Sequence, residues 1–86
     1  MKDADTETRR RIRLSIWAYA YEFEDHAIVS DAEFDAAAAL VDLNQRTKNP
    51  DLDFWFVLNF TPDSGLWIHK HPDLAGIKNL YERHFS

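Results

Sequence analysis

Apolar residues recur at helical spacing along the first quarter of the chain, and this pattern does most to limit what the chain can fold into. Four large side chains follow one another at i, i+4, i+7 and i+11: Ile12, Ile16, Tyr19 and Phe23. Three more share a second face at i, i+3 and i+7: Leu14, Trp17 and Tyr21. The spacing predicts a helix from about Thr6 to Asp25 or His26. A helix with two apolar faces either packs on both sides or leaves aromatic side chains for a ligand or partner.

The start of a second helix is marked by a capping box. Ser30 is followed three residues later by Glu33, and in this motif each side chain accepts a hydrogen bond from the backbone amide of the other residue. The run Ala36–Ala39 favours continuation of the helix. We expect the second helix to extend to about Thr47, forming an antiparallel helical hairpin with the first.

The chain beyond this hairpin has a third helix start and one ambiguous stretch. Asn49 before Pro50 combines an N-cap residue with proline at the first helical position. Residues 53–71 are then predicted to form a short helix or, alternatively, a β-hairpin, because Phe54, Phe56, Leu58 and Phe60 alternate. Asp73 is expected to cap a C-terminal helix. The predicted fold class is mainly α, with residues 1–86 as one small domain.

Composition excludes several classes of protein. The chain has 86 residues, a net charge of −5 and no cysteine. The negative charge argues against direct binding to duplex nucleic acid, which depends on Lys and Arg at phosphates. The lack of cysteine excludes a disulfide scaffold and a thiolate zinc site. No apolar run approaches the ~20 residues of a membrane span, and no signal peptide is evident. We expect a cytoplasmic protein that does not bind membranes.

Histidines offer a weak signal for metal binding. His69 and His71 are separated by one residue, but a zinc site would need His26 or His84 and a carboxylate such as Asp73 to converge on them. The sequence has no ligand spacing of this kind, so we expect no metal site.

Three segments together resemble a known domain. Val29-Ser30-Asp31-Ala32-Glu33-Phe34-Asp35 resembles the N-terminal Ia domain of NAD-dependent bacterial DNA ligases. That domain is a helical hairpin whose second helix opens with S/P-D-A-E-Y-D. Asn49-Pro50-Asp51-Leu52 is similar to the HPEL segment of the family, and Thr61-Pro62-Asp63-Ser64 is a weaker echo of its TPDSP. The resemblance covers residues 9–52, and residues 53–86 form an aromatic-rich C-terminal addition.

The resemblance implies a nucleotide site. In these ligases the domain closes over the nicotinamide mononucleotide half of NAD, which implies that Tyr21, Asp31 and Asp35 contact this ligand. Phe34 stands where the family has Tyr, and Glu22 where it has His or Tyr, so both belong to the implied site. Aromatic faces and carboxylates suit a cationic nicotinamide ring. The structural alternative is that Asp31 complements the helix dipole and that the aromatic residues belong to the core.

Two hypotheses about function follow. None of the lysines lies in the K-x-D-G motif that carries the ligase nucleophile, so we expect no enzyme activity and no catalytic residue. The first hypothesis is a small adaptor or inhibitor without a cofactor, similar to accessory proteins of phages, that binds a protein partner or forms homo-oligomers through its many aromatic residues. The second is a module that binds nicotinamide mononucleotide or NAD.

Overall fold

A 22-residue helix, α1 (Asp3–Glu24), is the element on which the other helices pack. The computed structural model describes residues 3–85, with side chains from residue 6 onward. After α1 come α2 (Asp31–Ala39), α3 (Pro50–Asn59), the 3-10 helix η1 (Leu66–Lys70) and α4 (Leu74–His84). Within residues 3–85 every regular element is helical, so the prediction of a mainly α fold is confirmed. None of the described helices is both long enough and apolar enough to cross a bilayer.

α1 carries the largest share of the core and contacts α2, η1 and α4. Its buried apolar residues are three large ones and two alanines: Leu14, Ile16, Ala18, Tyr19 and Ala20. The two alanines allow neighbouring elements to come close to the α1 backbone. From the other elements the core receives Ala38, Phe56, Phe60, Trp67, Ile68, Ile77 and Tyr81. Burial of each large apolar side chain contributes roughly 1.5–3 kcal/mol to folding.

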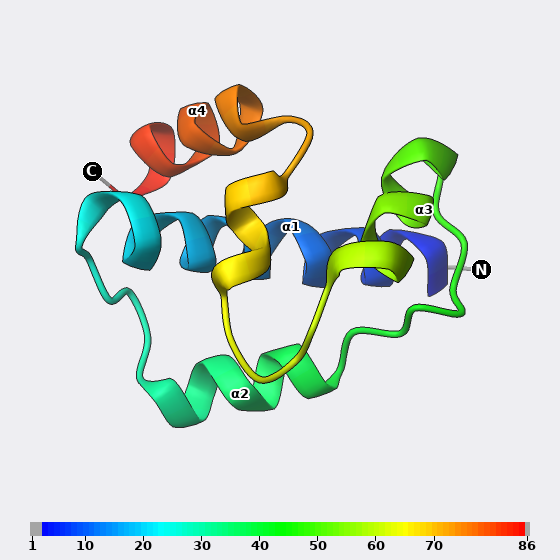
Figure 1. Cartoon of the computed structure of the whole chain (residues 1–86), viewed down its shortest axis with the longest axis horizontal. Coiled ribbons are helices and arrows are strands. Elements are labelled where there is room, and N and C mark those ends of the chain that lie inside the picture. Colours follow the sequence, from blue (N-terminus) through cyan, green and yellow to red (C-terminus); the bar gives the residue numbers. More distant parts are fainter. Residues whose placement is uncertain (1–2, 86) are drawn as a thin grey trace.

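The predicted helical hairpin is present. α1 ends at Glu24, and Asp25 follows in the left-handed region (φ 53°), which Asp tolerates better than most residues. Figure 1 shows α2 running back beside α1 in the opposite direction. The hydroxyl of Ser30 accepts the amide of Glu33 at 3.1 Å, which is the first half of the predicted capping box.

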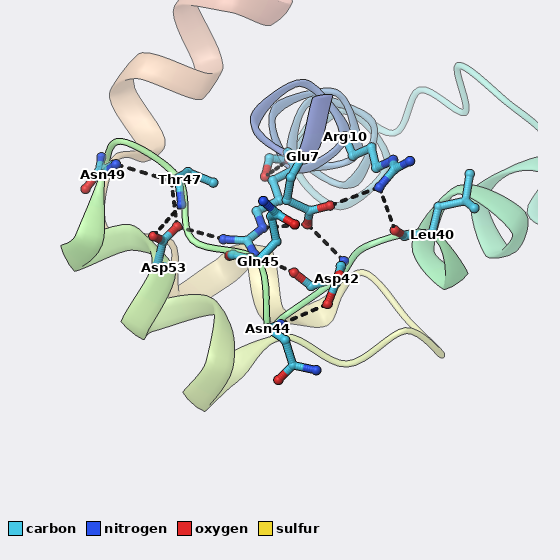
Figure 2. A network of polar contacts seen from close by, with 11 residues as sticks. Glu7, Arg10, Leu40, Asp42, Asn44, Gln45, Thr47, Asn49 and Asp53 are labelled. Carbon is cyan, nitrogen blue, oxygen red and sulfur yellow. Dashed lines mark hydrogen bonds and ion pairs between the residues drawn. The ribbon is translucent and has the colours of Figure 1, made fainter. Parts of the chain in front are cut away.

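The predicted end of the second helix is wrong, because α2 stops at Ala39 rather than near Thr47. In a continued helix the amide of Asp42 would donate to the carbonyl four residues earlier. Instead it donates to the carboxylate of Glu7 on α1, at 3.0 Å. The carbonyls of Asp42 and Gln45 accept from the guanidinium of Arg11, at 2.8 and 3.0 Å. Long-range polar contacts with α1 thus replace the intrahelical bonds that an extended α2 would make (Figure 2).

The short-helix prediction for the ambiguous stretch is confirmed, and the β-hairpin is wrong. The side chain of Asn49 accepts the amide of Leu52 at 3.1 Å and Pro50 occupies the first turn. Phe56 and Phe60 then fall one helical turn apart, and their ring centroids lie 5.7 and 5.1 Å from that of Trp67 on η1. These contacts require the helical spacing of the two Phe residues and would be lost in an extended strand.

The predicted cap of the C-terminal helix is also present. The carboxylate of Asp73 accepts the amide of Gly76 at 3.1 Å. A Cβ atom at position 76 would lie 2.4 Å from Oδ2 of Asp73, so glycine leaves space for the capping side chain. α4 then packs on α1 through Ile77 and Tyr81, which are both buried.

Candidate functional site

A cleft of about 310 Å³ opens where α1, α2 and the loop before η1 meet. All five residues of the predicted nucleotide site line it: Tyr21, Glu22, Asp31, Phe34 and Asp35. The two helices of the hairpin hold them in register, since Tyr21 and Glu22 come from α1 and the other three from the first turns of α2. Residues of two helices, 9 to 14 positions apart in the sequence, therefore face one space.

The third wall of the cleft was not predicted as part of the site. It consists of Asp63, Ser64 and Gly65, from the loop between α3 and η1. A Cβ atom at position 65 would lie 3.2 Å from Cβ of Ala18 and 3.5 Å from Cζ of Phe34. Glycine therefore lets this loop lie directly against both helices. The sequence signal for this wall was the weak similarity of residues 61–64 to a ligase segment.

The cleft is acidic. Four carboxylates line it, from Glu22, Asp31, Asp35 and Asp63, and its lining contains no Lys or Arg. Glu22 is engaged by Nε2 of His69 at 2.8 Å. The three Asp side chains are exposed and have no hydrogen bond or ion pair with another described side chain. Like charges collected in a hollow create a negative potential that attracts cations.

One aromatic face of the cleft is available to a ligand. Tyr21 is 60% exposed. Trp17 and Phe34 are half-buried and packed on the core, and the guanidinium of Arg13 lies 5.5 Å from the centroid of the Trp17 ring. Tyr21 is thus the ring that can contact a flat ligand, and such contact with a cation is favourable by about 0.5–2 kcal/mol.

Beside the cleft, a cluster of aromatic residues joins the end of α1 to α4. The ring of Tyr19 stacks on Phe23 with centroids 5.0 Å apart, and its hydroxyl donates to Glu24 at 2.9 Å. Burial, together with the carboxylate of Glu24, raises the pKa of Tyr19 to about 12. Nδ1 of His26 and the hydroxyl of Tyr81 are 2.8 Å apart. This cluster fixes the C-terminal turn of α1, which carries Tyr21 and Glu22.

A second and larger cavity, of about 850 Å³, is a groove between α1, α3 and α4. Among its lining residues is His71, which is 6% exposed. Nδ1 of His71 accepts the amide of Asp73 at 2.9 Å. Burial lowers the pKa of this histidine below its ordinary value of 6.5, and the nearby charge of Asp73 offsets part of that effect. The neutral ring is therefore the form that the fold favours.

The protein is expected to lose stability in mild acid because His71 must then be protonated. A group whose pKa is lowered by folding stabilises the fold above its unfolded pKa, and this contribution is lost as the pH falls through the folded pKa. Urea unfolding at pH 7.5 and at pH 5.0 should give a smaller free energy at the lower pH. The loss should be smaller in His71→Gln, whose amide oxygen can still accept the Asp73 amide, and unchanged in His84→Gln on the exposed end of α4. An equal loss in wild type and His71→Gln would contradict this assignment.

The histidines do not converge on a metal site. His69 pairs with Glu22, whereas His71 bonds the backbone of Asp73. Among the described side chains, no group of three His, Cys, Asp or Glu residues is placed to hold a metal ion.

The structure thus gives one acidic cleft that contains the five predicted site residues and one apolar groove that the sequence did not predict. Comparisons of the chain with family models, with curated proteins and with solved structures found no match in any of the three.

Proposed function

We propose that the protein is a non-catalytic binding module whose cleft takes the nicotinamide end of a nicotinamide nucleotide. The observation that carries the proposal is the meeting of Tyr21, Glu22, Asp31, Phe34 and Asp35 in one cleft. Resemblance to the ligase Ia domain in residues 9–52 supports the same ligand. The oxidised nicotinamide ring is flat and positively charged, and the cleft offers it an exposed aromatic face and a negative potential.

Charge decides which part of the ligand the cleft favours. A unit charge 4 Å from a carboxylate interacts by about 1 kcal/mol in bulk water and by about 4 kcal/mol near a protein surface, before desolvation is counted, and four carboxylates line the cleft. These carboxylates repel a phosphate, and no Lys or Arg of the lining offsets them. The phosphate of a bound nucleotide must then point to solvent or to a group supplied by another protein. Nicotinamide riboside should therefore bind at least as tightly as nicotinamide mononucleotide.

Calorimetric titration with nicotinamide riboside and nicotinamide mononucleotide tests the proposal. We expect binding at millimolar ligand or below. The double variant Asp31→Asn with Asp35→Asn should weaken binding at least tenfold, which corresponds to about 1.4 kcal/mol. The reduced mononucleotide, whose ring is neutral, should bind at least tenfold more weakly than the oxidised form. Higher ionic strength should weaken binding of the oxidised riboside.

Glu33→Gln is the matched control for this titration. Glu33 lies with Asp31 in the first turn of α2 and is exposed, but it does not line the cleft. Removal of the Glu33 charge should therefore change the affinity for nicotinamide riboside less than twofold. Absence of heat at millimolar ligand would overturn the nucleotide function. Binding that survives the double variant would overturn the site assignment.

A second candidate function is that of an adaptor or inhibitor that binds a protein partner. It is favoured by three apolar residues of α3 that are more than half exposed: Phe54 at 65%, Val57 at 54% and Leu58 at 65%. Contiguous exposed apolar surface of this kind marks interaction sites.

A further inference from the structure

The groove between α1, α3 and α4 is apolar in its lining and continues onto exposed surface. Leu52, Trp55, Ile77 and Leu80 line it. At its rim stand Phe54 and Leu58, one helical turn apart on α3, and Ile12, which is 37% exposed. The cavity of about 850 Å³ therefore has large exposed apolar side chains in its own lining, which suits a macromolecular partner that can cover them.

α3 has more apolar surface than its own fold covers. From Leu52 to Leu58 its only polar residue is Asp53. A helix that is apolar on all sides is normally buried on all sides. Among these residues only Phe56 is fully buried, so one side of α3 is left for another element to cover.

His71 provides a polar anchor in this apolar groove. Its side chain is more than nine-tenths buried. Nδ1 accepts the amide of Asp73, so in the neutral ring Nε2 carries the proton. Nε2 has no hydrogen-bond partner among the described residues. Every fully buried side-chain nitrogen or oxygen of these residues does have such a partner, so Nε2 is not fully buried. Nε2 is therefore still reached by solvent from the groove and can donate to an acceptor of an occupant.

The charged side chains at the edge of the groove indicate which residues a bound partner would carry beside its apolar face. Two exposed acids, Asp51 and Asp73, line the groove against one exposed base, Lys48. Arg11 is 3% exposed and already paired with Glu7 and Asp53. The edge of the groove is thus acidic. The chain as a whole is acidic as well, with a net charge of −5.

We propose that this groove docks an amphipathic α-helix of another protein, one whose apolar face is flanked by Lys or Arg. The α3 wall has the length of a short helix face, because the part of α3 that lines the groove, from Asp51 to Leu58, spans about 10 Å at 1.5 Å per residue, which is about two turns of a partner helix. Docking of an apolar helix face into a groove is a common mode of recognition. The proposal rests on the second candidate function and not on the nucleotide cleft.

A second copy of this chain fits the groove less well. Its α3 exposes apolar residues but has only acids, Asp51 and Asp53, in its first turn. Its α4 has basic residues in the last turn, but the apolar residues Ile77 and Tyr81 are buried against α1. Neither helix combines a free apolar face with flanking positive charge.

Selection from a displayed library of single helices tests the proposal. Each helix carries Leu, Phe or Trp at four positions of one face, with flanking positions drawn from Lys, Glu and Gln. The full chain should enrich helices with Lys at the flanks. Their affinity should fall at least tenfold in Leu58→Gln and less than twofold in Val57→Gln. These neighbours are similarly exposed, but only Leu58 lines the groove.

Three kinds of result would overturn the proposal. Enrichment of no helix, or of helices with Glu at the flanks, contradicts the stated partner chemistry. Equal losses in the two variants place the contact outside the groove and leave the adaptor function standing. Sedimentation that finds a dimer in wild type and a monomer in Leu58→Gln makes a second copy the occupant. Unchanged nicotinamide riboside titration in Leu58→Gln keeps this test separate from that of the cleft.

Discussion

Replacement of Arg11 by Met is expected to lower the free energy of unfolding by about 3–5 kcal/mol. The guanidinium is almost fully buried and bonds four groups: the carboxylates of Glu7 at 2.7 Å and Asp53 at 2.8 Å, and the carbonyls of Asp42 and Gln45. Removal of one partner leaves buried charges without compensation, which costs more than the net worth of the pair. In a small domain with a total stability of about 5–15 kcal/mol, much of the fold would be lost.

The electrostatics of Asp53 support this expectation. Burial by itself would raise the pKa of this carboxyl, but hydrogen bonds from the hydroxyl and amide of Thr47, with the charge of Arg11, hold it below the ordinary value of 3.8. Asp53 therefore remains ionised and needs its cation. Glu7 is 1% exposed and would lose its shortest ion pair, that with Arg11.

Arg10→Met is the matched control. Arg10 lies beside Arg11 on α1 and contacts Glu7 at 3.3 Å and the carbonyl of Leu40 at 3.4 Å, but its side chain is 34% exposed. Its removal should cost less than about 1 kcal/mol. Urea unfolding followed by circular dichroism measures both variants. A loss below 1 kcal/mol for Arg11→Met would show that the network does not hold the segment after α2 to α1.

Replacement of Phe56 by Ala is expected to cost about 3–5 kcal/mol as well. Phe56 is 0% exposed, its ring packs on Phe60 and Trp67, and the guanidinium of Arg11 lies 5.3 Å from its centroid. The cavity left by the ring would loosen Trp67, whose indole donates to the carbonyl of Ser64 at 2.8 Å. Since Ser64 belongs to the third wall of the cleft, this variant should also weaken nicotinamide riboside binding under conditions where it remains folded.

Phe54→Ala is the matched control, because it removes the same type of side chain from an exposed position of the same helix. Phe54 lies two residues away on the same helix but is 65% exposed, so its removal should change stability by less than about 0.5 kcal/mol. Thermal unfolding of both variants gives the comparison, with an expected fall of about 4–8 °C in Tm for each kcal/mol lost. Similar Tm values for the two variants would contradict the burial of Phe56 and the exposure of Phe54.

Local signals made the helix starts predictable and the helix ends less so. Ser30, Asn49 and Asp73 each cap the helix that they were expected to cap, because a cap bonds backbone amides two or three residues away. The end of α2 depends on Arg11, some thirty residues earlier in the sequence. Four of the five positions from Arg9 to Arg13 on α1 are Arg residues, and nothing in that run marks Arg11 as the buried one.

The residues of the candidate site also fall into a part that the sequence predicts and a part that it does not. Asp31 and Asp35 share a helix face by their spacing alone, and the hairpin turn brings Tyr21 to them. Asp63 and Gly65 reach the cleft through the packing of the loop before η1 on Ala18 and Phe34, which no local pattern encodes. The groove was missed because it is formed by three helices whose mutual placement depends on the tertiary fold.

The central claim is that the acidic cleft binds the nicotinamide end of a nucleotide, and amide and indole chemical shifts recorded during titration with nicotinamide riboside test it most directly. The claim predicts shifts at Trp17, at the amides of residues 31–35 and at those of residues 63–65, with no change around Leu58 and His71. Absence of any shift at millimolar ligand, or shifts confined to the groove, would contradict it.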